Sequence, residues 1–309
     1  MNPSPRDIET DFNPSGLRGR LRQNEPMSKH TSWRVGGLAQ WFYEPADSTD
    51  LAHFMRQLPA KMPVFWLGLG SNLLVRDGGI RGVVILTAGL LDEIKLLDKE
   101  RVYVEAGVSC AKLARFAARA GLTGTEFLAG IPGTVGGALA MNASAWGGET
   151  WSFVREVTTL NRQGQFCDRT AADYQIGYRS VEGPNEEWFV ATTLQLAPNQ
   201  GEPGQAKIRS LLDKRNKNQP IGVASCGSVF RNPPGDFAGR LIEQAGWKGR
   251  GVGGAYVSEK HANFIINKEG ATAADIENLI EQIKVSVEKI YHIHLVPEVH
   301  IVGELKINN

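Results

Sequence analysis

The chain has 309 residues, with 34 lysines and arginines against 33 aspartates and glutamates, and a formal net charge of +1 at pH 7. This length predicts two or three folding units. The balanced charge excludes a global basic field that would attract nucleic acid or an anionic membrane, so local groups must hold any anionic ligand. The cysteines at 110, 167 and 226 include no CxxC pair, which favours a reducing, cytoplasmic compartment.

Two segments could be mistaken for targeting or membrane elements. The start of the chain has no apolar core between its charges, so we expect a loosely ordered tail over 1–29 rather than a secretory signal. The segment Phe127–Gly148 carries no charge, but it holds Pro132, Asn142 and six glycines. A lipid-exposed helix would not tolerate these breakers and polar groups, so we expect no membrane insertion.

The first part of the chain is predicted to mix short strands with helices. Apolar runs bounded by turn residues predict strands over 38–43, 63–67, 82–87, 101–106, 153–160 and 187–196. Apolar residues spaced by three and four predict helices over 50–58, over 111–120 and around 208–212. Pro220 is expected to end the last of these helices.

A second unit is predicted to begin near Ile221. Its expected strands lie over 226–231, 253–257, 262–267 and 299–305, and a helix is expected over 237–246. A long final helix is predicted to start at Thr272, because Asp275 stands three residues later as in a capping box. The chain shows no internal repeat or low-complexity block.

The first glycine-rich segment follows the predicted strand 63–67. Glycines at 68 and 70 let the backbone turn tightly, so that several amide N–H groups can point at one phosphate without a basic side chain. The Ser71 hydroxyl and the Asn72 amide could add donors. No third glycine follows and no helix is predicted here, so this is not a dinucleotide-binding fingerprint. A simple glycine-rich turn remains an alternative.

The second glycine-rich segment runs over 128–149 and contains Gly130, Gly133, Gly136 and Gly137. Small residues throughout suggest that the backbone packs closely against something flat or bulky, and a dinucleotide cofactor is the natural candidate. Tight helix–sheet packing is the alternative. Two such segments in one chain, each after an apolar run, favour a cofactor.

Six motifs occur in one order along the chain: GLGSNLLVRD (68–77), VEAGV (104–108), LAGIPGTVGGALAMNASAWGGE (128–149), YRS (178–180), CGSVFRNP (226–233) and PEVHIVGE (297–304). Together they resemble the UDP-N-acetylenolpyruvoylglucosamine reductase family, over about 30–304. Some members carry a tyrosine loop between the fourth and fifth motifs, and this chain resembles the shorter subtype without it. Arg231 stands where many members have lysine.

The resemblance implies an α+β fold. A two-subdomain FAD-binding domain of the vanillyl-alcohol-oxidase-like type would span 30–218, with subdomains over about 30–90 and 91–218. A C-terminal α+β domain over 219–296 would bind the UDP-sugar, and a strand within 297–309 would return to the first subdomain. FAD would be bound non-covalently and NADPH would donate hydride.

The resemblance also implies the reaction, in which UDP-N-acetylglucosamine enolpyruvate is reduced to UDP-N-acetylmuramate for peptidoglycan synthesis. Negative charge would build on the substrate carboxylate and require a cation, a proton donor and a dry site. The family pattern places these roles on Arg179, Ser228 and Glu298: the arginine grips the carboxylate, the serine gives the proton and the glutamate supports the charge. Without the resemblance, a surface ion pair, a turn serine and a solvated carboxylate would be the ordinary readings.

The remaining site residues follow from the same resemblance. Expected cofactor-binding residues are Gly68, Leu69, Gly70, Ser71, Asn72, Gly130, Ile131, Pro132, Gly133, Thr134, Gly137, Ala138, Asn142 and Ala143. Expected substrate-binding residues are Tyr178, Arg231 and Asn232. The nearby cations Arg240, Lys248 and Lys260 could meet the diphosphate.

Some tempting residues are not expected to be functional. His292 and His294 would share one face of a strand, but no further ligand cluster supports a metal site. Cys226 lacks the histidine context of a nucleophile and is expected to be a small packed residue. We expect the UDP-sugar and NADPH as partners, with no nucleic acid and no obligate protein partner.

Two other functions remain open from the sequence. The chain could be another flavoprotein of the same fold that acts on a sugar or lactone, although the GLGSN segment lacks the histidine or cysteine of a covalent flavin site. It could also be a non-catalytic nucleotide-binding protein. The joint presence of Arg179, Ser228 and Glu298 argues against the latter.

Overall fold

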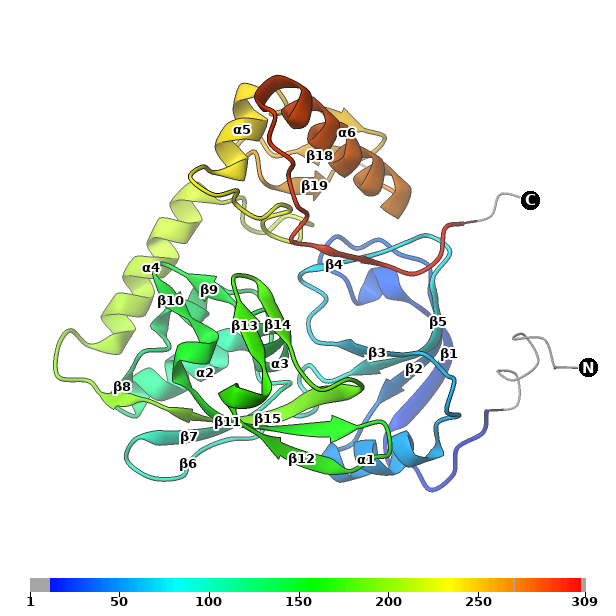
Figure 1. The fold of residues 1–309 in the computed structure, drawn as a ribbon, viewed down its shortest axis with the longest axis vertical. Coiled ribbons are helices and arrows are strands. Elements are labelled where there is room, and N and C mark those ends of the chain that lie inside the picture. Colours follow the sequence, from blue (N-terminus) through cyan, green and yellow to red (C-terminus); the bar gives the residue numbers. More distant parts are fainter. Residues whose placement is uncertain (1–11, 269, 307–309) are drawn as a thin grey trace, which may run out of the picture. The chain divides into compact units, whose positions relative to one another are not determined.

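The computed structural model describes residues 12–268 and 270–306. The chain divides into two compact units. Unit 1 consists of the described parts of Met1–Gln23, Trp41–Gly68 and Gly82–Leu212, and unit 2 of those of Asn24–Gln40, Leu69–Arg81 and Asp213–Asn309. Figure 1 labels many of the helices and strands of both units.

The first sheet is built mainly from unit 1 and has the strand order β1-β2-β5-β3. Its strands are β1 (Arg20–Pro26), β2 (Leu38–Glu44), β5 (Ile80–Leu86) and β3 (Val64–Leu67). Strands β3 and β5 run parallel. Helix α1 (Ser48–Gln57) shares one apolar core with this sheet, which includes Tyr43, Phe54 and Ile85.

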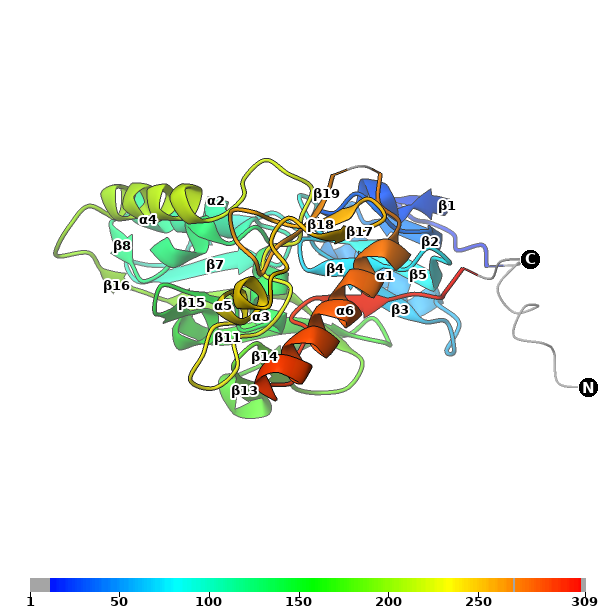
Figure 2. The same cartoon turned by 90° about the horizontal axis from the view of Figure 1, so that it is seen from above.

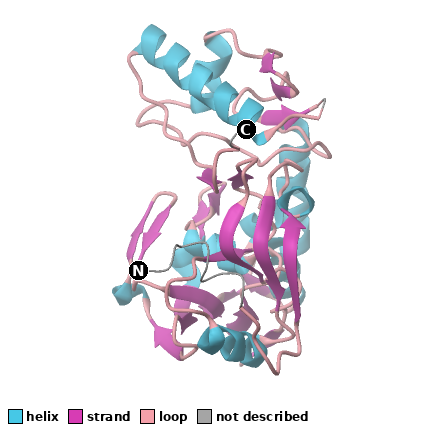
Figure 3. Ribbon diagram, turned by 90° about the vertical axis from the view of Figure 1, so that its right-hand side faces the viewer, coloured by secondary structure: helices cyan, strands magenta, loops and turns pink. Residues whose placement is uncertain are grey.

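The second sheet of unit 1 is antiparallel, with the order β12-β11-β15-β7-β6 (Figure 3). Its strands are β12 (Phe166–Arg169), β11 (Val154–Asn161), β15 (Glu187–Gln195), β7 (Arg101–Glu105) and β6 (Ile94–Leu96). Helix α2 (Cys110–Arg119) begins at Ser109, whose side chain accepts from the Lys112 amide, and buries Leu113, Ala114 and Ala117.

Short elements complete unit 1. They are η2 (Glu126–Gly130), α3 (Val135–Ala140), η3 (Thr150–Phe153) and η4 (Ala171–Asp173), with the strand pairs β8 (Leu122–Thr123) and β16 (Ala197–Pro198), β9 (Ser144–Ala145) and β10 (Gly148–Glu149), and β13 (Gln175–Gly177) and β14 (Ser180–Glu182). Helix α4 (Gly204–Asn218) follows, with Ile208 and Leu211 buried.

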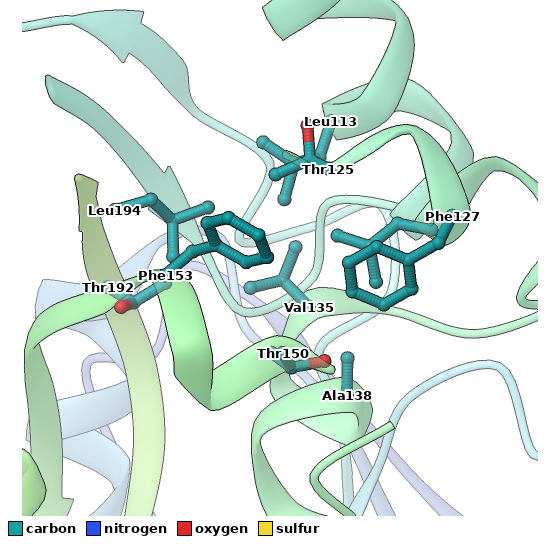
Figure 4. A pocket seen from close by; sticks show the side chains of 10 residues that line it. Leu113, Thr125, Phe127, Val135, Ala138, Thr150, Phe153, Thr192 and Leu194 are labelled. Carbon is teal, nitrogen blue, oxygen red and sulfur yellow. The ribbon is translucent and has the colours of Figure 1, made fainter. Parts of the chain in front are cut away.

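A small cavity of about 10 Å³ lies in the core of unit 1 (Figure 4). Leu113, Phe127, Val135 and Ala138 are among its mostly apolar lining residues. Helix α3 thus turns Val135, Ala138 and Leu139 into the core. Because one face of this short helix is used in this way, Gly137 and Ala140 on its other face are exposed.

Unit 2 contains the antiparallel sheet β17 (Gly251–Val252), β18 (Ala255–Val257) and β19 (Ile265–Asn267). Its helices are η1 (Met27–Lys29), α5 (Ala238–Gln244) and α6 (Ala273–Tyr291), and α6 packs on the sheet and on α5 (Figure 2). Thr272 and Asp275 form the predicted capping box of α6. Strand β20 (His300–Val302) pairs in parallel with β4 (Leu73–Val75).

Three local predictions need correction. Residues 20–26 form strand β1 and Phe12 is buried, so the expected tail does not extend over the described residues 12–29, while 1–11 lie outside the described residues. The expected strand over 226–231 is only one isolated bridge, between Phe230 and Pro297. His292 is the left-handed C-cap of α6, with φ of 57°, rather than a strand residue. The apolar pattern of the sequence does not show which segments pair as strands or where a helix ends.

Among the described residues, no helix has both the length and the apolar character needed to cross a membrane.

Asp50 is a buried carboxylate in unit 1 that organises the start of α1. It accepts hydrogen bonds from the Tyr43 hydroxyl and from the amides of Arg18, Gly19 and Ala46. Burial acts to raise the Asp50 pKa, but these hydrogen bonds outweigh it, so the pKa lies below its usual value. The ionised carboxylate therefore stabilises the fold above the pKa of the unfolded chain, and this stabilisation is lost as pH falls through the lowered folded pKa.

We expect Asp50→Asn to lower the free energy of unfolding at pH 7 by about 1–3 kcal/mol, because buried donors lose a charged acceptor. Urea denaturation at pH 7 and at pH 3 measures this loss and its acid dependence. The difference between parent and variant should shrink toward pH 3. An equal free energy of unfolding at pH 7 would contradict the assigned role.

Candidate functional site

The segment 68–72 links β3 to β4 and turns at a glycine in the left-handed conformation. Gly70 has φ of +60°, and a Cβ there would lie 2.0 Å from the His30 carbonyl oxygen, so only glycine fits. The Gly70 carbonyl accepts from the Ser32 amide. Within the described ranges, the backbone N–H groups of 69–72 donate to no protein acceptor. Adjacent donors of this kind are what a phosphate group requires.

Asn72 has a structural partner. Its side-chain Nδ2 donates to the Glu298 carbonyl oxygen at 3.0 Å, and its own carbonyl accepts from the His300 amide. Asn72 therefore positions the backbone of Glu298 within unit 2. A contact with a cofactor stays a prediction.

The second glycine-rich segment is bound to the turn between β7 and α2. The Gly133 carbonyl accepts from the Cys110 amide, and the amides of Val135 and Gly136 donate to the carbonyls of Val108 and Ala106. A Cβ on Gly68 would lie 2.6 Å from Thr134 Oγ1, so glycine at 68 permits a close approach of two loops in unit 1. The VEAGV motif (104–108) thus holds the backbone of this segment through hydrogen bonds that the carbonyls of Ala106 and Val108 accept.

Gly137 gives a direct test of whether a bulky group fits here. It is exposed, and apart from its chain neighbours and the backbone of its own helix, the nearest atom to a Cβ built on it is Thr134 Oγ1, at 3.8 Å. Nothing in the described protein therefore requires a glycine at this position. A flat ligand lying against the backbone would require one, so the segment fits the predicted cofactor.

Other predicted cofactor residues lie inside the protein. Gly130, Ala138 and Ala143 are buried. The Asn142 side chain is 2% exposed; its Nδ2 donates to Glu149 and to the Gly177 carbonyl, and its Oδ1 accepts from the Trp151 amide. Asn142 therefore links the β9–β10 and β13–β14 hairpins, and only its backbone could reach a cofactor.

Arg179 lies at the turn of the β13–β14 hairpin, in a left-handed conformation with φ of 56°. Its Nη2 donates to the Ser144 carbonyl at 3.1 Å, and its guanidinium carbon lies 5.8 Å from the centre of the Tyr178 ring. Tyr178 is 54% exposed. Trp146, at the tip of the β9–β10 hairpin, is also exposed and was not singled out from the sequence.

In unit 2 the structure brings together the segments that carry Ser228 and Glu298. The Glu298 amide donates to the Val229 carbonyl at 2.7 Å, and the Arg231 amide donates to the Val296 carbonyl at 2.9 Å. The Ser228 and Glu298 motifs, about 70 residues apart in the chain, are therefore neighbours. Cys226 is buried, and burial, with the nearby Glu298 charge, raises its thiol pKa well above the usual value, as expected for a packed residue.

The remaining candidates are held by the protein itself. Asn232 Oδ1 accepts from the Ala238 amide at the start of α5, so its Nδ2 is the group left to donate to a substrate. Arg240 pairs with Asp236, Lys248 with Glu243, and Lys260 donates to the Asn216 carbonyl. These pairings give no support to an individual role at a diphosphate. The described residues contain no cluster that could hold a metal ion.

Comparisons with known proteins show the family to which the chain belongs. The family model described as FAD binding domain matches residues 39–168, and the model described as UDP-N-acetylenolpyruvoylglucosamine reductase, C-terminal domain, matches residues 219–302. The reductase of that name from Alkalilimnicola ehrlichii is 59% identical over 286 residues, 93% of this chain and 96% of that protein. The one from Methylococcus capsulatus is 56% identical, over 93% and 94%.

A solved structure is also similar. The crystal structure of UDP-N-acetylenolpyruvylglucosamine reductase from Thermus caldophilus matches with a TM-score of 0.78 and 32% identity, covering 93% of this chain and all of that chain.

Proposed function

The chain belongs to the UDP-N-acetylenolpyruvoylglucosamine reductase family, and from this premise we propose which of its residues bind the cofactor and perform the reaction. The protein is an oxidoreductase that reduces UDP-N-acetylglucosamine enolpyruvate to UDP-N-acetylmuramate in peptidoglycan precursor synthesis, using FAD and NADPH. Its α+β fold has an FAD-binding domain followed by a C-terminal domain. An oxidase acting on a sugar or lactone is not favoured.

We propose that the backbone of Gly68–Asn72 and of Gly130–Gly137 binds FAD. The amides of 69–72 that lack protein acceptors among the described residues support binding of the diphosphate, and the exposed Gly137 supports close packing against a flat ring. When bound, FAD supplies hydride transfer from NADPH to the enolpyruvyl double bond. The flavin domain boundaries expected from the sequence, 30–218, remain part of this proposal.

Arg179, Ser228 and Glu298 have complementary roles in the proposal. The Arg179 guanidinium holds the substrate carboxylate, on which charge develops during reduction. Ser228 Oγ donates a proton to the carbon next to that carboxylate. Glu298 stabilises the charge that develops there. The backbone pairing of the Ser228 and Glu298 segments is the observation that supports their joint action.

Substrate recognition is proposed for Tyr178, Arg231 and Asn232. Tyr178 is the exposed aromatic side chain next to Arg179. The balanced charge supports an enzyme that needs no nucleic acid or membrane, and the absence of a CxxC pair supports a cytoplasmic location.

Steady-state kinetics should show parallel lines in double-reciprocal plots, because NADPH and the enolpyruvyl substrate are proposed to use one pocket in turn. High concentrations of the UDP-sugar should inhibit by occupying the pocket before NADPH. Varying both substrates in a matrix of initial rates measures this pattern. Intersecting lines, which indicate that both substrates bind together, would contradict the shared pocket.

A further inference from the structure

The segment that carries Ser228 has almost no regular secondary structure. Residues 226–233 form no strand, and a single bridge between Phe230 and Pro297 links them to the Glu298 segment. A proton donor must nevertheless be held within a fraction of an ångström of its working position. Something other than a sheet must therefore fix this backbone.

Asn263 is the residue that holds it. Its Oδ1 accepts from the Phe230 amide at 3.0 Å, and its Nδ2 donates to the Phe230 carbonyl at 2.9 Å. Its own carbonyl also accepts from the Val229 amide at 2.9 Å. One planar amide thus bonds to both polar groups of a single residue, as a neighbouring strand would.

The far side of the same backbone is bonded to the Glu298 segment. The Val229 carbonyl accepts from the Glu298 amide, and the Arg231 amide donates to the Val296 carbonyl. Residues 229–231 are therefore held between Asn263 on one side and 296–298 on the other. A shift of Asn263 would therefore change the position of Ser228 relative to Glu298.

Asn263 is itself rigidly placed. Its side chain is 4% exposed, so water does not compete for its hydrogen bonds. Its backbone N–H donates to His261 Nδ1 at 3.2 Å, and the backbone N–H of His261 donates to Ser258 Oγ at 3.3 Å. Burial, followed by the charge of Lys248, lowers the His261 pKa, which favours the neutral ring that this acceptor role requires.

We infer that Asn263 is a positioning residue that sets the backbone of 229–230 and thereby directs Ser228 toward the substrate, opposite Glu298. The inference rests on the proposed role of Ser228. Position 263 requires an asparagine because only a short side chain with both a donor and an acceptor satisfies the backbone N–H and the carbonyl of Phe230. An ionised aspartate has the same shape, but it would place an anionic oxygen against the Phe230 carbonyl.

The main test is Asn263→Asp, followed by stopped-flow flavin absorbance for each half-reaction. Flavin content and reduction by NADPH should stay close to those of the parent, while re-oxidation by the enolpyruvyl UDP-sugar slows by about 10²-fold at saturating substrate, the loss expected for a displacement of about 1 Å. Asn263→Gln, which keeps the donor and the acceptor on a longer side chain, should show the same split with a smaller loss.

Asn267 provides the matched control. It lies on β19, and its side-chain amide also bridges two backbone segments, by donating to the Trp33 carbonyl and accepting from the Ala271 amide. Asn267→Asp should lower thermal stability without separating the two half-reactions. If the Asn263 variants lose both half-reactions equally, as a folding defect would cause, or if they re-oxidise at the parent rate, the positioning role is wrong.

A double variant separates this inference from the function on which it rests. If Asn263 acts through Ser228, then Ser228→Ala with Asn263→Asp should re-oxidise no more slowly than Ser228→Ala alone. Multiplied losses would show that Asn263 acts independently and would overturn the inference. A Ser228→Ala variant with the parent re-oxidation rate would instead overturn the proposed role of Ser228 itself.

Discussion

Gly137→Val is expected to give a folded protein that binds FAD more weakly than the parent. Apart from its own helix backbone and chain neighbours, no protein atom lies closer than 3.8 Å to a Cβ at Gly137. Valine is also somewhat better than glycine inside a helix, so the fold itself should not suffer. A bound flavin lying against this backbone would collide with the new side chain. A misfit of this size costs about 1–3 kcal/mol, which corresponds to about a 5- to 150-fold loss of FAD affinity.

The measurement is the flavin-to-protein absorbance ratio after purification, with FAD titration of the apoprotein and thermal unfolding. Gly201→Val is the control, because Gly201 is exposed and has no atom within 4 Å of its Cβ in a loop outside the proposed site. It should keep full flavin content. Gly70→Val is a poorer test because its Cβ would collide with the His30 carbonyl even without a cofactor. Full FAD occupancy in Gly137→Val would exclude contact at this residue.

Ser228→Ala is expected to separate the two half-reactions. The hydroxyl is assigned only to protonating the carbon next to the carboxylate, which NADPH does not need. Flavin reduction should therefore proceed nearly at the parent rate, whereas re-oxidation by the enolpyruvyl substrate should fall by about 10²–10⁴-fold, the contribution of a positioned general acid.

Stopped-flow absorbance under anaerobic conditions follows each half-reaction of Ser228→Ala alone. Cys110→Ala and Cys226→Ala are controls for the substitution of a small buried residue. Burial raises the pKa of the Cys110 thiol to about 12 and that of the Cys226 thiol well above its usual value, so neither thiol is reactive. Neither should separate the half-reactions. The role of Ser228 is falsified if its alanine variant re-oxidises at the parent rate.

Regular elements of this fold could be predicted from the sequence where local signals are strong. The capping box at Thr272 and the apolar face of α6 marked the final helix correctly. Strand β1 was missed because its residues are mostly polar and only one of them is buried, so its place in the sheet depends on pairing with β2 rather than on an apolar pattern of its own. No local signal could show that.

The site was predictable as a set of motifs but not as an arrangement. Glycines at 68 and 70 indicate that other groups pack closely against this backbone, and the structure shows that these groups belong to Thr134 and His30. Asn263 was missed because an isolated asparagine before a short strand has no signature. Its importance lies in two hydrogen bonds to Phe230, a residue 33 positions away, and only tertiary structure reveals them.

The central claim, that this chain is a flavin-dependent reductase of an enolpyruvyl UDP-sugar, is tested most directly by an anaerobic titration of the purified protein. NADPH should bleach the flavin absorbance at one equivalent per chain. Adding UDP-N-acetylglucosamine enolpyruvate should restore the absorbance within the mixing time of a manual experiment, with UDP-N-acetylmuramate formed in equal amount, while air restores it slowly. A bleached flavin that air re-oxidises rapidly and the enolpyruvyl UDP-sugar does not re-oxidise would contradict the account.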